Sequence, residues 1–167
     1  RYRPIALLST AYKLYAKMIH LRISPHVNEV LRKTQAGFRP GHGTADAIGL
    51  LRRTVEILLT STREREIHII LLDWMKAFDK LDHPGLLEAL YRIGLPPGIK
   101  NAIRSNYTSP RFWCKKLGQT SAPHRQNTGI RQGCPLSPFL FVTWMTVMMQ
   151  DAEDDLHRQH RPQRDQM

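Results

Sequence analysis

The amino-acid sequence predicts an α+β fold. Apolar residues at helical spacing are followed by a short β-branched run and, later, by two strand-like segments around a glycine. These segments lack the regular strand–helix–strand alternation that builds a parallel sheet. The chain has 167 residues, 41% of them hydrophobic and 23% charged, which is typical of one globular domain or of a piece of a larger one.

The N-terminal residues predict two consecutive helices. The first follows Ser9 or Thr10 as its cap, and Ser24-Pro25 begins the second, because proline fits the first turn of a helix. The second helix is expected to end near Leu31. The first helix carries two neighbouring apolar stripes, which consist of Leu14, Met18 and Leu21 and of Tyr12, Tyr15 and Ile19.

A loop, a helix and a buried strand are expected next. Residues 35–43 hold three glycines and a proline, a composition typical of a loop. Thr44 caps the helix that follows it, and residues 67–72 form the apolar, β-branched run of a buried strand that ends at Asp73. The helix has one apolar stripe, made of Ile48, Leu51, Val55 and Leu58.

Two more helices are expected after the strand. Asp82-His83-Pro84 begins one of them, and Gly94 ends it. Its inward residues are Leu87, Leu90 and Ile93. The other helix covers Pro97–Tyr107.

The C-terminal third predicts strands, a loop and a long helix. Residues 111–117 and 125–128 are expected to form two strands around Gly118. Residues 129–135 form a loop, and Ser137-Pro138 begins a helix that runs to about Gln150. Residues 158–167 are a polar tail.

The chain is strongly basic. Twenty-five lysines and arginines against 14 aspartates and glutamates give a net charge of +11. Residues 1–66 alone carry +7, so we expect this part to face a polyanion. No apolar run is long enough to span a bilayer, and no leader sequence is recognisable. Cys114 and Cys134 make neither a disulfide framework nor a metal-ligand pattern, so we expect an intracellular protein.

Three segments carry residues suited to chemistry. Asp73 at the end of a buried strand would attract a divalent cation, or it caps a turn. In residues 129–138, Arg131 suits a phosphate and Gln132 a sugar or base edge, unless this is a plain glycine-rich connector. In residues 35–44, Phe38 offers a stacking surface for nucleic acid, or it lies in the core.

Together these segments resemble, in order, the sequence blocks of reverse transcriptases of non-long-terminal-repeat (LINE-like) retrotransposons, with group II intron enzymes as near relatives. Residues 2–8 resemble the opening block of the fingers, and residues 35–41 match the Gln-x-Gly-Phe-Arg-Pro-Gly block. Residues 73–79 match motif A, and residues 129–138 match motif B.

The resemblance implies RNA-directed DNA polymerisation, in which a DNA primer is extended on an RNA template from deoxynucleoside triphosphates with two Mg²⁺ ions. It implies that Asp73 and the carbonyl of Trp74 are metal ligands, and that Phe78 is a steric gate against the ribose 2′-OH. We expect Asp79 to cap or brace the loop rather than to bind a metal ion. The implied nucleotide-binding residues are Phe78, Arg131, Gln132, Gly133 and Arg3, and the implied template-binding residues are Gly37, Phe38 and Arg39.

The resemblance also implies a right-hand polymerase fold. The fingers would comprise residues 1–66 and about 84–128, and a partial palm with an incomplete antiparallel sheet would comprise about 67–83 and 129–157. A further endonuclease domain in the full polyprotein and residence in the nucleus are implied in the same way, and no membrane is expected.

One block of the family has no good match. Residues 152–155, Ala-Glu-Asp-Asp, have alanine where an aromatic residue precedes the metal-binding Asp-Asp pair, so we interpret them as part of a solvated helix end. The resemblance leads us to expect that the thumb is absent as well. We therefore expect a truncated fragment that does not polymerise alone. A non-catalytic nucleic-acid-binding module and a decayed retrotransposon copy are the alternative interpretations.

Overall fold

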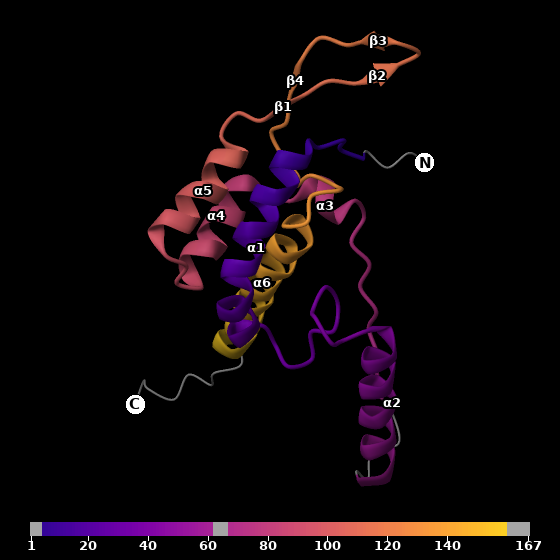
Figure 1. Cartoon of the computed structure of the whole chain (residues 1–167). Helices are drawn as coiled ribbons and strands as arrows, with labels where there is room; N and C mark the ends of the chain where they lie inside the picture. The colour runs from indigo at the N-terminus through magenta and orange to yellow at the C-terminus, as the bar shows by residue number, and fades with distance from the viewer. Residues whose placement is uncertain (1–4, 62–66, 160–167) are drawn as a thin grey trace.

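The computed structural model describes residues 5–61 and 67–159, and its centre is a body of packed helices (Figure 1). Helix α4 packs against α5 and α6, and α1 lies along α6. Helix α2 stands apart at one end, and a narrow β-ribbon projects at the other. The helices are α1 (Thr10–Val30), α2 (Thr44–Ser61), α3 (Ala77–Lys80), α4 (His83–Arg92), α5 (Pro97–Tyr107) and α6 (Ser137–Gln159).

Helix α1 is continuous, so the predicted break at Ser24-Pro25 is wrong. Ser9 caps the helix as expected, because its side chain accepts from the backbone N–H of Tyr12 at 3.3 Å. The buried face continues across the proline; it consists of Ala16, Ile19, Ile23 and Val27. Burying the isoleucine and valine side chains contributes about 1.5–3 kcal/mol each, which offsets the roughly 3 kcal/mol cost of an interior proline.

The core lies between α1, α4, α5 and α6. Leu86 and Leu90 of α4, Ile103 of α5, and Phe139 and Leu140 of α6 are fully or almost fully buried. As predicted, Asp82 caps α4 by accepting from the backbone N–H of Gly85 at 2.8 Å, and α5 covers Pro97–Tyr107.

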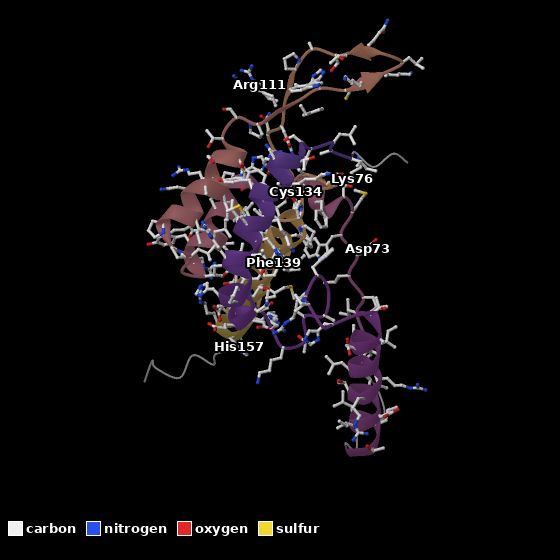
Figure 2. The ribbon with its side chains drawn as sticks, viewed as in Figure 1. Asp73, Lys76, Arg111, Cys134, Phe139 and His157 are labelled. Carbon is white, nitrogen blue, oxygen red and sulfur yellow. The ribbon has the colours of Figure 1, made fainter. Side chains whose placement is uncertain are left out.

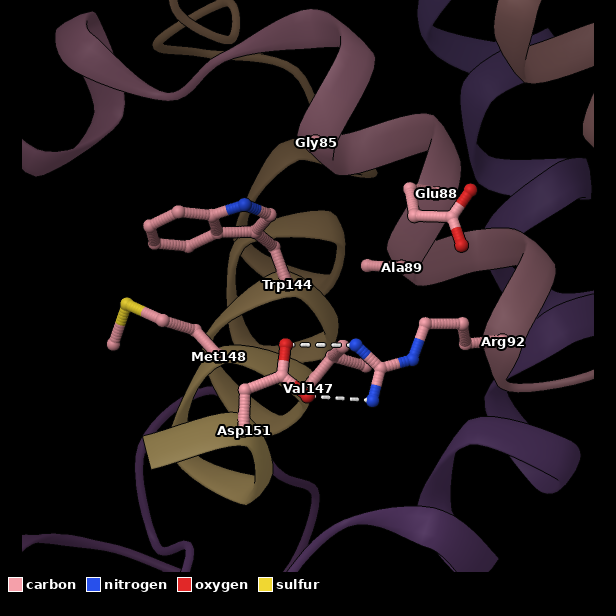
Figure 3. Close-up of a pocket in the computed structure, with 8 residues that line it drawn as sticks. All are labelled: Gly85, Glu88, Ala89, Arg92, Trp144, Val147, Met148 and Asp151. Atoms are coloured by element: carbon pink, nitrogen blue, oxygen red, sulfur yellow. Dashed lines mark hydrogen bonds and ion pairs between the residues drawn. The ribbon is translucent and has the colours of Figure 1, made fainter. Parts of the chain in front are cut away.

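Helix α6 is nine residues longer than expected, because its acidic last turns find basic partners. Arg92 of α4 donates two hydrogen bonds to Asp151, both 2.7 Å long, across a shallow pocket lined by α4 and α6 (Figure 3). These bonds lower the pKa of Asp151. Arg32 donates to Glu153 at 2.6 Å. Residues 152–155 are therefore exposed helix, as predicted.

The predicted buried strand at residues 67–72 is wrong. These residues are extended but form no strand, and Ile70 and Leu71 are 81% and 84% exposed. A strand needs a partner for its backbone hydrogen bonds, and the described residues offer none here. The predicted apolar stripe of α2 is exposed for most of its length, with Ile48 at 65% and Leu51 at 45% exposure. The apolar stripe of Leu14, Met18 and Leu21 on α1 is exposed too.

The predicted pair of strands is a ribbon of four two-residue strands. Strand β1 (Arg111–Phe112) pairs with β4 (His124–Arg125), and β2 (Lys115–Lys116) pairs with β3 (Gln119–Thr120), both antiparallel. Leu117 and Gly118 form the two-residue turn with positive φ angles of 48° and 80°, a conformation that the twist of a hairpin favours. The chain thus combines helices with small antiparallel sheets. Among the described helices, none has the length and apolar character that crossing a bilayer requires.

The packing predicts a large difference between two leucines. Leu86→Ala opens a cavity beneath α4 and should lower the free energy of unfolding by about 2–5 kcal/mol. Leu117→Ala, at a position 94% exposed, should change it by less than about 0.5 kcal/mol. Urea denaturation followed by far-UV circular dichroism measures both. Equal losses would contradict this core.

Candidate active site

The segment around motif A (residues 73–79) is joined to motif B (residues 129–138) by backbone hydrogen bonds. Gly129 N–H donates to the Leu81 carbonyl at 2.7 Å, and Ile130 N–H donates to the Phe78 carbonyl at 2.8 Å. An isolated antiparallel bridge links Asp82 with Thr128 beside them. Two segments some fifty residues apart in the chain therefore form one seam, which we call the A–B seam.

Gly129 makes the close approach possible. Its φ of +84° lies in the left-handed region that favours glycine. A Cβ atom here would lie 2.6 Å from the carbonyl oxygen of Asp79, a distance that real Cβ atoms do not adopt. The A–B seam thus requires glycine for both its torsion and its lack of a side chain.

Gln132 and Gly133 continue the A–B seam toward the N-terminal segment. Gln132 Nε2 donates to Asp79 Oδ1 at 2.7 Å, which agrees with the prediction that Asp79 braces the loop. The Gln132 carbonyl accepts from Ala6 N–H at 2.8 Å, and a Cβ on Gly133 would lie 3.0 Å from the Ala6 carbonyl. The structure thus brings part of the opening block to motif B, while Arg3 lies outside the described residues.

His83, at the start of α4, supports the A–B seam through a hydrogen bond that the sequence did not predict. Its Nε2 lies 2.7 Å from the Gly129 carbonyl, which can only accept, so the imidazole donates. Gln126 Nε2 donates to the same carbonyl at 3.0 Å. The His83 ring is buried, and its centre lies 5.0 Å from that of Tyr107. The only sequence signal was the helix start at Asp82, which says nothing of a partner in motif B.

Arg131 is directed into the helical body. It donates to Tyr12 Oη at 2.6 Å and to the Asn106 carbonyl at 2.9 Å. Its guanidinium also lies 5.0 Å from the ring centre of Tyr12 and 5.7 Å from that of Tyr107, within cation–π range. Burial raises the pKa of Tyr12 to about 12, so this phenol stays neutral. Two donors of Arg131 are thus occupied by the protein, and the predicted contact with a nucleotide remains a prediction.

Phe78 lies in a row of aromatic rings that joins motif A to the loop at residues 35–43. Its ring stacks on Phe141 of α6 at 4.9 Å, with the planes only 18° apart. Phe38 meets it edge-on at 5.9 Å and 76°. The structure therefore brings the predicted steric gate and the predicted template-binding aromatic residue together. Phe38 is 54% exposed, which rules out its alternative place in the core.

The rest of that loop is tied to the end of α1. Arg39 donates to the carbonyls of Arg32 and Asn28 at 3.1 and 3.3 Å, and so satisfies carbonyls at the end of the helix. Gly37 precedes Phe38, whose φ of +58° is unusual for a residue with a side chain. The loop is thus held in place while the ring of Phe38 is presented outward.

Asp73 lies away from these contacts. It is exposed on the extended segment that leads from α2 toward α3, apart from the helical body that holds Phe139 (Figure 2). Among the described residues, no group of three or more Asp, Glu, His or Cys side chains could hold a metal ion. The roles of Asp73 and of the Trp74 carbonyl as metal ligands therefore remain a prediction.

Comparison with known proteins identifies the family. The family model described as "Reverse transcriptase (RNA-dependent DNA polymerase)" matches residues 1–160. The chain belongs to the reverse transcriptase family.

Similar proteins come from mobile elements. The chain is 34% identical over 142 residues to the transposon TX1 uncharacterized 149 kDa protein of Xenopus laevis, covering 84% of this chain and 11% of that protein. It is 33% identical over 150 residues to the RNA-directed DNA polymerase from mobile element jockey of Drosophila funebris, covering 88% and 16%. It is 29% identical over 148 residues to the Pol polyprotein of the type-1 retrotransposable element R2 of Nasonia vitripennis, covering 89% and 14%. The chain thus spans less than one fifth of each of these relatives.

Membership of the reverse transcriptase family confirms the resemblance read from motifs A and B, and the A–B seam shows how these motifs are joined here. Four predicted residues lie at this seam or in the aromatic row beside it: Phe78, Gln132, Gly133 and Phe38. Asp73 and Trp74 lie apart from them, and Arg131 and Arg39 each donate two hydrogen bonds within the protein.

The A–B seam predicts that two glycines with similar torsions respond differently to alanine. Gly118→Ala, at φ +80° in open space, should lower the free energy of unfolding by about 1 kcal/mol. Gly129→Ala, at φ +84°, adds the clash with Asp79 and distorts two backbone hydrogen bonds, and should lower it by at least about 2 kcal/mol more. Urea denaturation measures both variants, and similar losses would contradict the close approach.

Proposed function

We propose that this chain is the fingers and part of the palm of an RNA-directed DNA polymerase, which extends a DNA primer on an RNA template from deoxynucleoside triphosphates. The observation that carries the proposal is the A–B seam. It supports a nucleotide site because Gln132, Gly133 and Phe78 come from two distant segments and meet beside the loop that carries Phe38. In this proposal residues 1–66 and about 84–128 are fingers, and about 67–83 and 129–157 are palm.

Phe78 is the proposed specificity residue. Phe141 behind it and Phe38 at its edge hold the ring in one orientation. A held aromatic ring selects by exclusion, because it leaves no room for an added ribose 2′-OH. Gln132, Gly133 and Arg3 are the proposed contacts of the nucleotide, and Gly37, Phe38 and Arg39 those of the template.

Arg131 contributes to the nucleotide site by position in this proposal. Its hydrogen bonds to Tyr12 and to the Asn106 carbonyl fix the residue before Gln132 against α1 and α5. Because Gln132 in turn holds Asp79, the location of Arg131 determines how the motif B loop meets motif A.

Asp73 and the Trp74 carbonyl are the proposed ligands for Mg²⁺. Two such ions would stabilise the charge that develops on the transferred phosphoryl group. Among the described residues, no group of three or more Asp, Glu, His or Cys side chains completes this ligand set.

A chimeric polymerase tests the assignment of Asp73. Residues 5–159 replace the aligned segment of the jockey RNA-directed DNA polymerase of Drosophila funebris, and the measurement is primer extension on an RNA template. Asp73→Asn should lower the rate about 100- to 1,000-fold, because a metal ion contributes several kcal/mol of transition-state stabilisation. Asp154→Asn, an exposed carboxylate on α6, is the matched control and should leave the rate unchanged.

Template–primer binding shows whether the chimera is folded. A chimera that binds template–primer but extends no primer would contradict the proposed function. Normal extension by the Asp73→Asn chimera would contradict the metal assignment alone.

The same chimera tests the gate. Phe78→Ala should lower the ratio of kcat/KM for deoxynucleotides to that for ribonucleotides about 10- to 100-fold, because the clash with the 2′-OH is lost. Phe78→Tyr keeps the ring and should keep the ratio. Single-nucleotide incorporation measures both, and a ratio unchanged by Phe78→Ala would reject the gate.

A further inference from the structure

The β-ribbon, residues 111–125, contains basic residues but no aspartate or glutamate. From Glu88 to Asp151 the intervening sequence contains no aspartate or glutamate. Four exposed basic residues of this stretch lie on the ribbon: Arg111, Lys115, Lys116 and Arg125. None of them forms an ion pair within the described part of the chain. The ribbon also projects beyond the helical body, so a long ligand could lie along it (Figure 1).

Two arginines are placed directly opposite each other. Arg111 and Arg125 are register partners in the β1–β4 pair, so their side chains leave the same face of the ribbon. Like charges in this arrangement repel, and no carboxylate among the described residues relieves them. A bound phosphate would convert the repulsion into two charge-assisted hydrogen bonds.

Aromatic rings accompany the arginines. Phe112 and His124 are the next register pair, on the other face, with ring centres 5.6 Å apart and planes at 33°. Trp113 is 60% exposed and Phe112 is 46% exposed. Exposed flat rings between cationic side chains are the arrangement that binds unpaired bases by stacking while the backbone phosphates are neutralised.

We propose that the ribbon binds single-stranded RNA, with Arg111 and Arg125 on a phosphate and Trp113 against a base. Duplex nucleic acid does not fit as well, because its bases are already stacked on one another. The choice of RNA rather than DNA rests on the proposed function, in which the template is RNA. Arg125 precedes Gly129 by only four residues, so RNA bound to the ribbon would lie close to the A–B seam.

Fluorescence anisotropy with a labelled, unstructured 12-nucleotide RNA tests the phosphate contacts. Log K falls as log salt rises. For the double variant Arg111→Ala/Arg125→Ala this fall should be less steep than for the wild-type chain by about 1.4, the value for two lost contacts on a single strand. Arg104→Ala/Arg158→Ala removes the same charge from exposed positions on α5 and α6, outside residues 1–66 and the ribbon, and is the matched control. A control that weakens RNA binding as much as the ribbon variant would overturn the proposal.

Trp113 tests the stacking contact. Trp113→Ala should raise the Kd for this RNA about 5- to 100-fold, and Trp113→Phe should restore most of the affinity because it keeps a flat ring. Trp113 lies outside the core, and circular dichroism checks that both variants fold like the wild type. Wild-type affinity in Trp113→Ala would overturn the stacking proposal.

DNA of the same sequence and the RNA duplex complete the test. Weaker binding of both supports the proposal, whereas equal or tighter binding of either one overturns it. The assay contains no nucleotide and no metal ion, so its failure leaves the proposed polymerase function standing. Conversely, an inactive chimera leaves RNA binding by the ribbon standing.

Discussion

The contact between Gly129 and the backbone of Asp79 is the constraint on which the candidate site depends. With no Cβ at Gly129, the start of motif B lies directly on the end of motif A, and its N–H reaches the Leu81 carbonyl. The Gly129 carbonyl then accepts from His83 at the start of α4 and from Gln126 at the end of the ribbon. One residue without a side chain therefore fixes α3, α4 and the ribbon relative to one another, because a buried backbone group that finds a partner avoids a desolvation cost of about 1–3 kcal/mol.

The residues that follow Gly129 extend this constraint to the rest of the helical body. Arg131 reaches Tyr12 of α1 and the Asn106 carbonyl of α5, and Gln132 reaches Asp79 and Ala6. A half-buried guanidinium is stable there because two hydrogen bonds and two aromatic faces replace its water. Motif B is thus a packing centre as well as a candidate nucleotide site. Both its packing and its place in the candidate site constrain its sequence, which explains why so short a segment was enough to indicate the family.

Local signals were sufficient to place α4, because Asp82 and Gly94 mark its two ends within a few residues, and α5 covers the predicted residues Pro97–Tyr107. Local signals gave wrong predictions where a contact that is distant in the sequence determines the structure. Pro25 reads locally as a helix start, yet the face of Ile23 and Val27 packs on the core and carries α1 through it. Residues 67–72 have the composition of a buried strand, but composition cannot show whether a partner strand is present. The contact of Arg131 with Tyr12, 119 residues away, leaves no local trace either.

These differences divide the candidate site into two parts. Phe78 and Asp79 are held by the A–B seam, by Phe141 and by Gln132, so this part of the candidate site is fixed by contacts within the described chain. Asp73 lies only five residues before Phe78, but Lys76 between them turns the chain through a left-handed φ of 56°. Beyond this turn the described residues offer no strand to pair with the segment. The orientation of Phe78 therefore depends on contacts among the described residues, whereas no described strand pairs with the segment before Asp73. The two proposed roles of motif A, exclusion by Phe78 and metal binding by Asp73, thus rest on different neighbours although they share seven residues of sequence.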